Sequence, residues 1–306
     1  MSSITVALDH SFLRRASEGK LEAEFASLKR LAESGKVQYV ASVIHLFEIA
    51  KHPNRERNIE EAKLIDSLRP RWLKYRLDLI GEELLNLFHV WRGEPHFCRG
   101  IEPVVTSPSQ QLSAGRIRII EPDASSAEGI VSYLQSHPEQ LEKLNKLEAF
   151  INYIATLKQL SEARSKGTAE FKKIREKGAR DLVRALAPER DHSSNFTRAS
   201  EREQFANEMD PWDCPTLATE LTLFEYRVRR NFIPEASEAW DLQFATAAVP
   251  YITVTAFDRQ FHNLVSQAAR ACKWIKSSFH PTVAEALAFI EQTVSPSSEA
   301  RSQPAS

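Results

Sequence analysis

The 306-residue sequence predicts an α/β fold in which a parallel sheet of four or five strands is covered by helices and interrupted by a large, mostly helical insertion. Three observations predict this fold. Short β-prone runs alternate with helical periodicity at both ends of the chain, which is typical of parallel sheets. The middle of the chain is charged and has the periodicity of amphipathic helices. Hydrophobic residues make up 42% of the sequence, enough to build a substantial core.

The N-terminal block, residues 1–53, is predicted to form strand, helix, strand and helix. Ile4–Leu8 is a short apolar run, and residues 11–34 then place apolar side chains every three or four positions until Gly35. Val37–Ala41 is a second strand candidate. A second helix begins at Ser42 and ends near His52-Pro53, since proline stops a helix.

The insertion, residues 54–230, is predicted to be mostly helical, with charged helices over residues 55–95. Further elements are expected as short strands at Pro103–Thr106 and Arg116–Ile120 and as helices at Glu139–Arg164 and Thr216–Arg230. The α/β pattern returns in residues 231–294 with a helix (Ser237–Val249), a strand (Tyr251–Ala256), a helix (Gln260–Ala271), a short strand (Lys273–Ser277) and a last helix (Thr282–Val294). The low-complexity tail, residues 295–306, is expected to be disordered.

Composition narrows the function classes. The 40 Lys and Arg residues nearly balance the 41 Asp and Glu residues, so the net charge of −1 points to no global attraction for nucleic acid. The cysteines are far apart and form no CxxC pair, which argues against a zinc knuckle or a disulfide framework: Cys98, Cys214 and Cys272. No basic-then-apolar leader and no run of about 18 apolar residues occurs, so we expect a cytoplasmic protein without a membrane span.

Acidic side chains stand at the predicted strand ends. Asp9 directly follows the first strand, and Asp258 follows the strand Tyr251–Ala256 by two residues. Parallel strands bring their carboxyl ends to one edge of a sheet, where ligands bind. Glu48 and Asp241 lie on the helices next to these strands. Four carboxylates near one crevice repel each other unless a cation is present, and Mg²⁺ or Mn²⁺ is the cation that prefers carboxylate oxygens.

Three segments, VALDHSFL, ASVIHLFEIAK and WDLQFATAAVPYITVTAFDRQF, resemble the signature blocks of PIN-domain proteins. The resemblance implies a PIN-like three-layer core formed by residues 1–53 and 231–294. It also implies that the matching acids are catalytic metal ligands: Asp9, Glu48, Asp241 and Asp258. The activity that it implies is metal-dependent endoribonucleolytic cleavage of single-stranded RNA.

Each acid also has an ordinary structural explanation. Asp9 could cap the following helix, and Asp258 could do the same or occupy a turn. Glu48 could belong to a surface ion pair, and Asp241 could be a first-turn acid favoured by the helix dipole. Two other functions therefore stay open: a PIN-like binding scaffold without activity, and a PIN-like nuclease that acts on DNA.

A basic stretch in the insertion is the candidate for phosphate contacts. Residues 158–198 hold eleven Lys or Arg against six Asp or Glu, and we single out Lys172, Lys173 and Arg175. The alternative is an ordinary solvated helix face. The insertion is also a candidate docking surface for a protein partner. Histidines near the acids are left outside the site, because surface or core histidines are more common than ligands: His10, His45 and His262.

Overall fold

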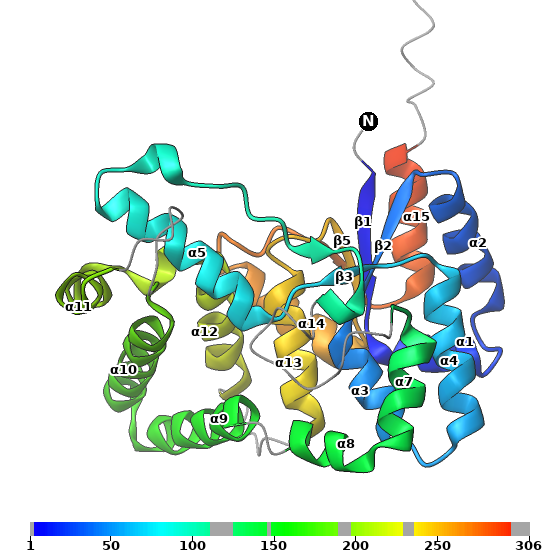
Figure 1. Ribbon diagram of the computed structural model, residues 1–306, viewed down its shortest axis with the longest axis horizontal. Coiled ribbons are helices and arrows are strands. Elements are labelled where there is room, and N and C mark those ends of the chain that lie inside the picture. The colour runs from blue at the N-terminus through cyan, green and yellow to red at the C-terminus, as the bar shows by residue number, and fades with distance from the viewer. Residues whose placement is uncertain (1–2, 111–124, 146–147, 189–196, 229–235, 295–306) are drawn as a thin grey trace, which may run out of the picture.

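The computed structural model describes residues 3–110, 125–145, 148–188, 197–228 and 236–294; the side chains of residues 143–154 and 236–238 are outside this description. The predicted strand Arg116–Ile120, most of the basic stretch beyond residue 188 and the C-terminal tail lie outside the described residues. Strands from both ends of the chain and two short strands from the region between them build one sheet, and several of the intervening helices form a lobe beside it (Figure 1).

The sheet has six strands in the order β4-β3-β2-β1-β5-β6. Five strands run parallel, and β4 at the edge pairs antiparallel with β3. The predicted α/β class is confirmed, but the predicted purely parallel sheet of four or five strands is wrong. The strands are β1 (Ile4–Leu8), β2 (Val37–Ser42), β3 (Arg71–Leu73), β4 (Val104–Val105), β5 (Val254–Ala256) and β6 (Ser278–His280).

Helices cover both faces of the sheet. On one face α2 and α15 lie side by side over β2 and β5, while α13 and α14 lie between the sheet and α12 of the lobe (Figure 1). The core helices are α1 (His10–Ser17), α2 (Glu22–Glu33), α3 (Val43–Lys51), α4 (Arg55–Ser67), α13 (Ala236–Ala248), α14 (Arg259–Ala269) and α15 (Val283–Val294). The remaining helices are α5 (Arg76–Trp91), η1 (Pro95–Phe97), α7 (Ala127–Ser136), α8 (Pro138–Asn145), α9 (Glu148–Lys166), α10 (Thr168–Leu186), α11 (Ala199–Glu208), η2 (Pro211–Asp213) and α12 (Pro215–Val228).

Several elements of the structure differ from those predicted. The helix predicted over residues 11–34 is two helices, because Gly19 adopts a φ of 74° that ends α1. The strand predicted at Lys273–Ser277 lies instead at Ser278–His280, where it pairs with β5. The strand β3 was not predicted at all. Pro70 breaks the helical pattern directly before it, and Trp72 of β3 is fully buried.

The sheet also extends into the region predicted as a helical insertion. Both β3 and β4 lie within residues 54–230, and they continue the sheet beyond β2. The helices α4 and α7 from the same region pack against α3. The part of this region that stands away from the sheet is therefore the lobe formed by α5 and α9–α12 (Figure 1).

Buried polar contacts join the helices of the lobe to one another and to the core. Arg76 of α5 forms an ion pair with Glu220 of α12 at 2.6 Å, and the two side chains are only 5% and 6% exposed. Glu83 of α5 accepts hydrogen bonds from the backbone N–H of Thr216 and from the hydroxyl of Tyr251, which lies just before β5. These contacts hold α5 and α12 against the segment that runs from α13 into β5, and so help to position both acid-bearing elements.

Candidate metal centre

Adjacent parallel strands bring Asp9 and Asp258 together. Leu8 at the end of β1 pairs with Ala256 at the end of β5, and the backbone N–H of Asp9 donates to the carbonyl of Ala256 at 2.9 Å. The backbone N–H of Asp258 then donates to the Asp9 carboxylate at 3.3 Å. Two acids separated by 249 positions in the sequence thus meet at one end of the sheet.

Asp241 and Glu48 interact electrostatically with Asp9 and with each other, and Asp258 also acts on Asp241. Glu48 lies on α3, which begins directly after β2 with Ser42 as its N-cap. Burial raises the pKa of Asp241 to about 9, and the charges of the other three acids add to the shift: Asp9, Glu48 and Asp258. The opposing charge is Arg227 of α12. All four predicted acids therefore influence one another at the carboxyl end of the sheet.

Burial and neighbouring acids also raise the pKa values of Glu48 and Asp9. Burial raises the pKa of Glu48 to about 7; nearby His10 and Lys51 oppose the shift, and Asp9 adds to it. Burial and the neighbouring Asp258 also raise the pKa of Asp9, while a hydrogen bond from the Ser11 hydroxyl at 3.0 Å opposes them. Carboxyl groups with raised pKa values are groups that a bound cation would stabilise in their charged form.

The ordinary structural roles explain only part of this arrangement. Asp258 does cap α14, because its Oδ1 accepts the backbone N–H of Phe261 at 2.8 Å. Asp9 stands at the N-cap position of α1, yet its side chain makes no capping hydrogen bond. In the described residues α13 begins at Ala236, so Asp241 lies beyond the first turn of its helix. Capping therefore accounts for Asp258 but not for Asp9 or Asp241.

Two further residues, His10 and Glu61, belong to the cluster and were not predicted. His10 Nε2 lies 3.0 Å from Glu61 Oε1, and His10 Nδ1 lies 3.8 Å from Glu48 Oε2. Burial lowers the pKa of His10, but its contact with Glu61 and the charge of Glu48 outweigh burial and raise the pKa overall. Glu61 could have been recognised from its spacing, because it shares the buried stripe of α4 with Ala62 and Ile65.

The neighbouring His45 belongs to the core. Its ring packs edge-on against Phe244 with 4.5 Å between centroids, and only 1% of the residue is exposed. Burial and nearby His10 lower the pKa of His45 to about 3, so its ring is neutral at physiological pH. We therefore assign His45 to packing, as its sequence context indicated.

The chemistry of the acids fits a hard divalent cation. Carboxylate oxygens are the ligands that Mg²⁺ and Mn²⁺ prefer. Burial and the neighbouring acids raise the pKa values of Asp241 and Glu48 despite the opposing charges of Arg227, His10 and Lys51. Among the described residues, no three Asp, Glu, His or Cys side chains already form a coordination group. Like charges push one another apart, so a cation would have to draw these carboxylates together.

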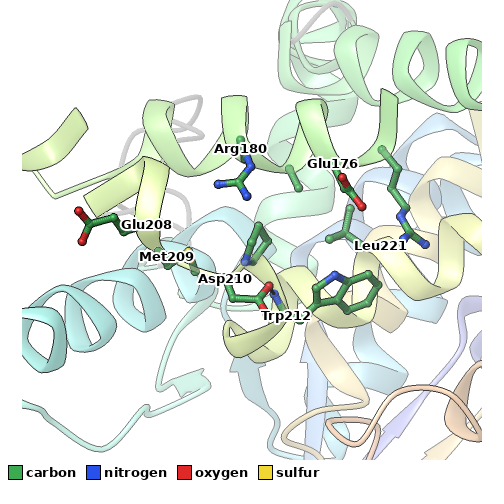
Figure 2. A pocket seen from close by; sticks show the side chains of 10 residues that line it. Glu176, Arg180, Glu208, Met209, Asp210, Trp212 and Leu221 are labelled. Atoms are coloured by element: carbon green, nitrogen blue, oxygen red, sulfur yellow. Dashed lines mark hydrogen bonds between the residues drawn. The ribbon is translucent and has the colours of Figure 1, made fainter. Parts of the chain in front are cut away.

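The three basic residues predicted to contact phosphate lie on α10 and differ in exposure and pairing. Lys172 and Lys173 are exposed, whereas Arg175 pairs with Glu225 and lies over the ring of Trp212 at 5.1 Å. A pocket of about 370 Å³ lies beside Arg175, with Arg180 and Trp212 among its lining residues (Figure 2). This pocket shares no residue with the acidic cluster, so Arg175 and Arg180 line a separate site on the lobe.

Comparison with known proteins adds no relative. No protein-family model matches the chain, and no curated protein and no solved structure matches it either. Among the helices of the described residues, none combines the length and apolar character needed to cross a membrane.

Proposed function

We propose that the chain is a divalent-metal-dependent endoribonuclease of PIN-like type, with Mg²⁺ or Mn²⁺ held by Asp9, Glu48, Asp241 and Asp258. The observation that carries this proposal is the convergence of the acids. The ends of β1 and β5 place the Asp9 carboxylate against the backbone of Asp258, and the charges of Asp9, Glu48 and Asp258 all act on Asp241. Acids crowded at the carboxyl edge of a parallel sheet are typical of a ligand site.

When bound, Mg²⁺ or Mn²⁺ supplies Lewis-acid chemistry: it makes water a nucleophile near neutral pH and stabilises charge on a phosphodiester. The side chains of this protein would hold and orient the components. Asp9 and Asp258 are fixed by the strand register, while the contact between His10 and Glu48 restrains the carboxylate on α3. Single-stranded RNA is the substrate class implied by the resemblance of the three sequence blocks to PIN-domain proteins.

A cleavage assay on labelled RNA and single-stranded DNA, with Mg²⁺ and with Mn²⁺, tests the proposal. We expect the wild-type protein to cut RNA, and Asp258→Asn to reduce cutting to background. Asparagine can still accept the backbone N–H of Phe261 that Asp258 accepts as the cap of α14, so the fold should be preserved while the charge is lost.

Asp181→Asn is the matched control, because Asp181 is an exposed aspartate on α10 with a side chain 53% exposed. We expect this variant to cut at the wild-type rate. Cutting that survives Asp258→Asn would show that the site is assigned to the wrong residues. A wild-type protein that cuts neither RNA nor DNA would favour the inactive scaffold, and cutting of DNA alone would favour a deoxyribonuclease.

A further inference from the structure

A second pocket adjoins the acidic cluster on its α1, α3 and α4 side. It has a volume of about 280 Å³, and Glu48 belongs to both the cluster and the pocket wall. His10 and Glu61, which form the ion pair beside Glu48, also line it. The cations Arg14, Lys51 and Arg57 also line it. The pocket and the acidic cluster therefore share the side chain of Glu48, so a ligand at the acids would lie next to the pocket.

Positive charge is in excess on the outer side of the pocket. Arg14 of α1 and Arg57 of α4 both line the pocket, and both contact the single carboxylate of Glu18. Lys20 contacts the same carboxylate at 2.7 Å. Three cations thus share one anion; Lys20 lies outside the pocket lining, and the two carboxylates of that lining, Glu48 and Glu61, contact His10. Because one carboxylate neutralises only one of the three cations, the remaining charge would favour a second anion at this position.

Besides Arg14 and Arg57, the pocket is lined by Lys51, whose charge acts on Glu48. Lys51 is three residues after Glu48 on α3, which places the two on neighbouring turns of one helix face. Its Nζ lies 4.5 Å from the centroid of the Trp240 ring, and Trp240 directly precedes Asp241. The ring therefore holds a positive charge in the pocket wall, beside the residue that precedes Asp241.

We infer that this pocket binds a backbone phosphate of single-stranded nucleic acid, next to the phosphate at the acidic cluster, through Arg14, Lys51 and Arg57. The inference rests on the proposed function, because that function places a substrate phosphate at the acidic cluster. Guanidinium groups match the geometry of phosphate oxygens, and both arginines have side chains that reach solvent, with 50% and 24% exposed.

The test is the binding of a fluorescein-labelled 12-nucleotide oligouridine RNA, and of its DNA counterpart, to the full chain. Fluorescence anisotropy is measured in EDTA, where no cleavage occurs, and again with Ca²⁺. Arg14→Gln combined with Arg57→Gln should weaken RNA binding by about tenfold or more, and should reduce the salt slope by about 0.7 for each lost phosphate contact. Arg15→Gln combined with Arg30→Gln is the control, because it removes two exposed arginines outside the pocket.

If the double variant is less stable, Arg14→Gln alone serves, because half of the Arg14 side chain is exposed and its contact with Glu18 is 3.8 Å long. An affinity equal to that of the control would overturn the inference. So would a loss of affinity confined to Lys172→Gln combined with Lys173→Gln, which would place the phosphate contacts on α10. Absence of any binding by the wild-type protein would also overturn it.

Cleavage, measured separately, distinguishes this inference from the proposed function. Binding that depends on Arg14 and Arg57 in a protein that cuts nothing would support the pocket and refute the nuclease. Normal cutting by wild-type protein, with binding that ignores both arginines, would refute the pocket alone. A pocket that acts in catalysis should raise KM in the double variant while leaving kcat nearly unchanged, since uniform binding is what it supplies.

Discussion

Replacing Asp241 with asparagine should stabilise the metal-free protein, and the gain should grow with pH. Asparagine has nearly the same shape but carries no charge, so it removes one member of a cluster whose members repel each other. The pKa of Asp241 is raised from 3.8 to about 9 in the folded chain. A raised folded pKa gives stability that is present in full below the unfolded value and is lost as pH rises toward the folded value.

The size of the effect follows from the shift. Each pKa unit corresponds to about 1.4 kcal/mol, so ionisable Asp241 weakens folding by at most about 6 kcal/mol at pH 8 and by about 1.6 kcal/mol at pH 5. Four acids share the repulsion, and protonating one relieves the others. We therefore expect a gain for Asp241→Asn of about 2 kcal/mol at pH 8 and under about 1 kcal/mol at pH 5.

Urea denaturation in EDTA at several pH values between 5 and 8 measures this difference. The control is Asp181→Asn, which removes an exposed carboxylate of α10 and should change the free energy of unfolding little at any pH. An Asp241→Asn variant that is less stable than wild type at pH 8 would refute the reasoning. A gain that stays constant with pH would also refute it, because the gain would then not come from ionisation.

The other predictions concern metal and packing. Mn²⁺ at about 100 times its dissociation constant should stabilise the wild-type fold by about 2.7 kcal/mol. The melting temperature should therefore rise in the wild-type protein but not in Asp258→Asn. An equal rise in both proteins would place the metal elsewhere. Arg76→Met should destabilise the fold by about 3–5 kcal/mol because it leaves Glu220 buried without its partner. Adding Glu220→Leu should recover most of that loss in urea denaturation, and failure to recover would show that Arg76 acts through other contacts.

The parts of the fold predicted from sequence are those with strong local signals. Apolar, β-branched runs marked β1 and β2 at nearly their observed bounds, and the strand predicted at Tyr251–Ala256 contains β5. The meeting of Asp9 with the backbone of Asp258 followed from a general property, since parallel strands bring their carboxyl ends to one edge.

The features that the sequence did not predict depend mostly on contacts between residues far apart in the chain. The strand β3 has three residues within a charged helical region, and its pairing with β2 and β4 makes it a strand. The ion pair between Arg76 and Glu220 spans 144 positions and leaves no local pattern. Glu61 was hidden by the exposed charges around it, although its place on the buried stripe of α4 was present in the spacing.

The central claim is that Asp9, Glu48, Asp241 and Asp258 form one divalent-metal site. Anomalous diffraction from crystals grown with Mn²⁺ tests it most directly. We expect an anomalous peak within about 2.5 Å of at least one carboxylate oxygen from each of Asp9 and Asp258, with Asp241 drawn toward it. A fully occupied Mn²⁺ peak that touches none of these acids, or crystals saturated with Mn²⁺ that show no peak at the ends of β1 and β5, would contradict it.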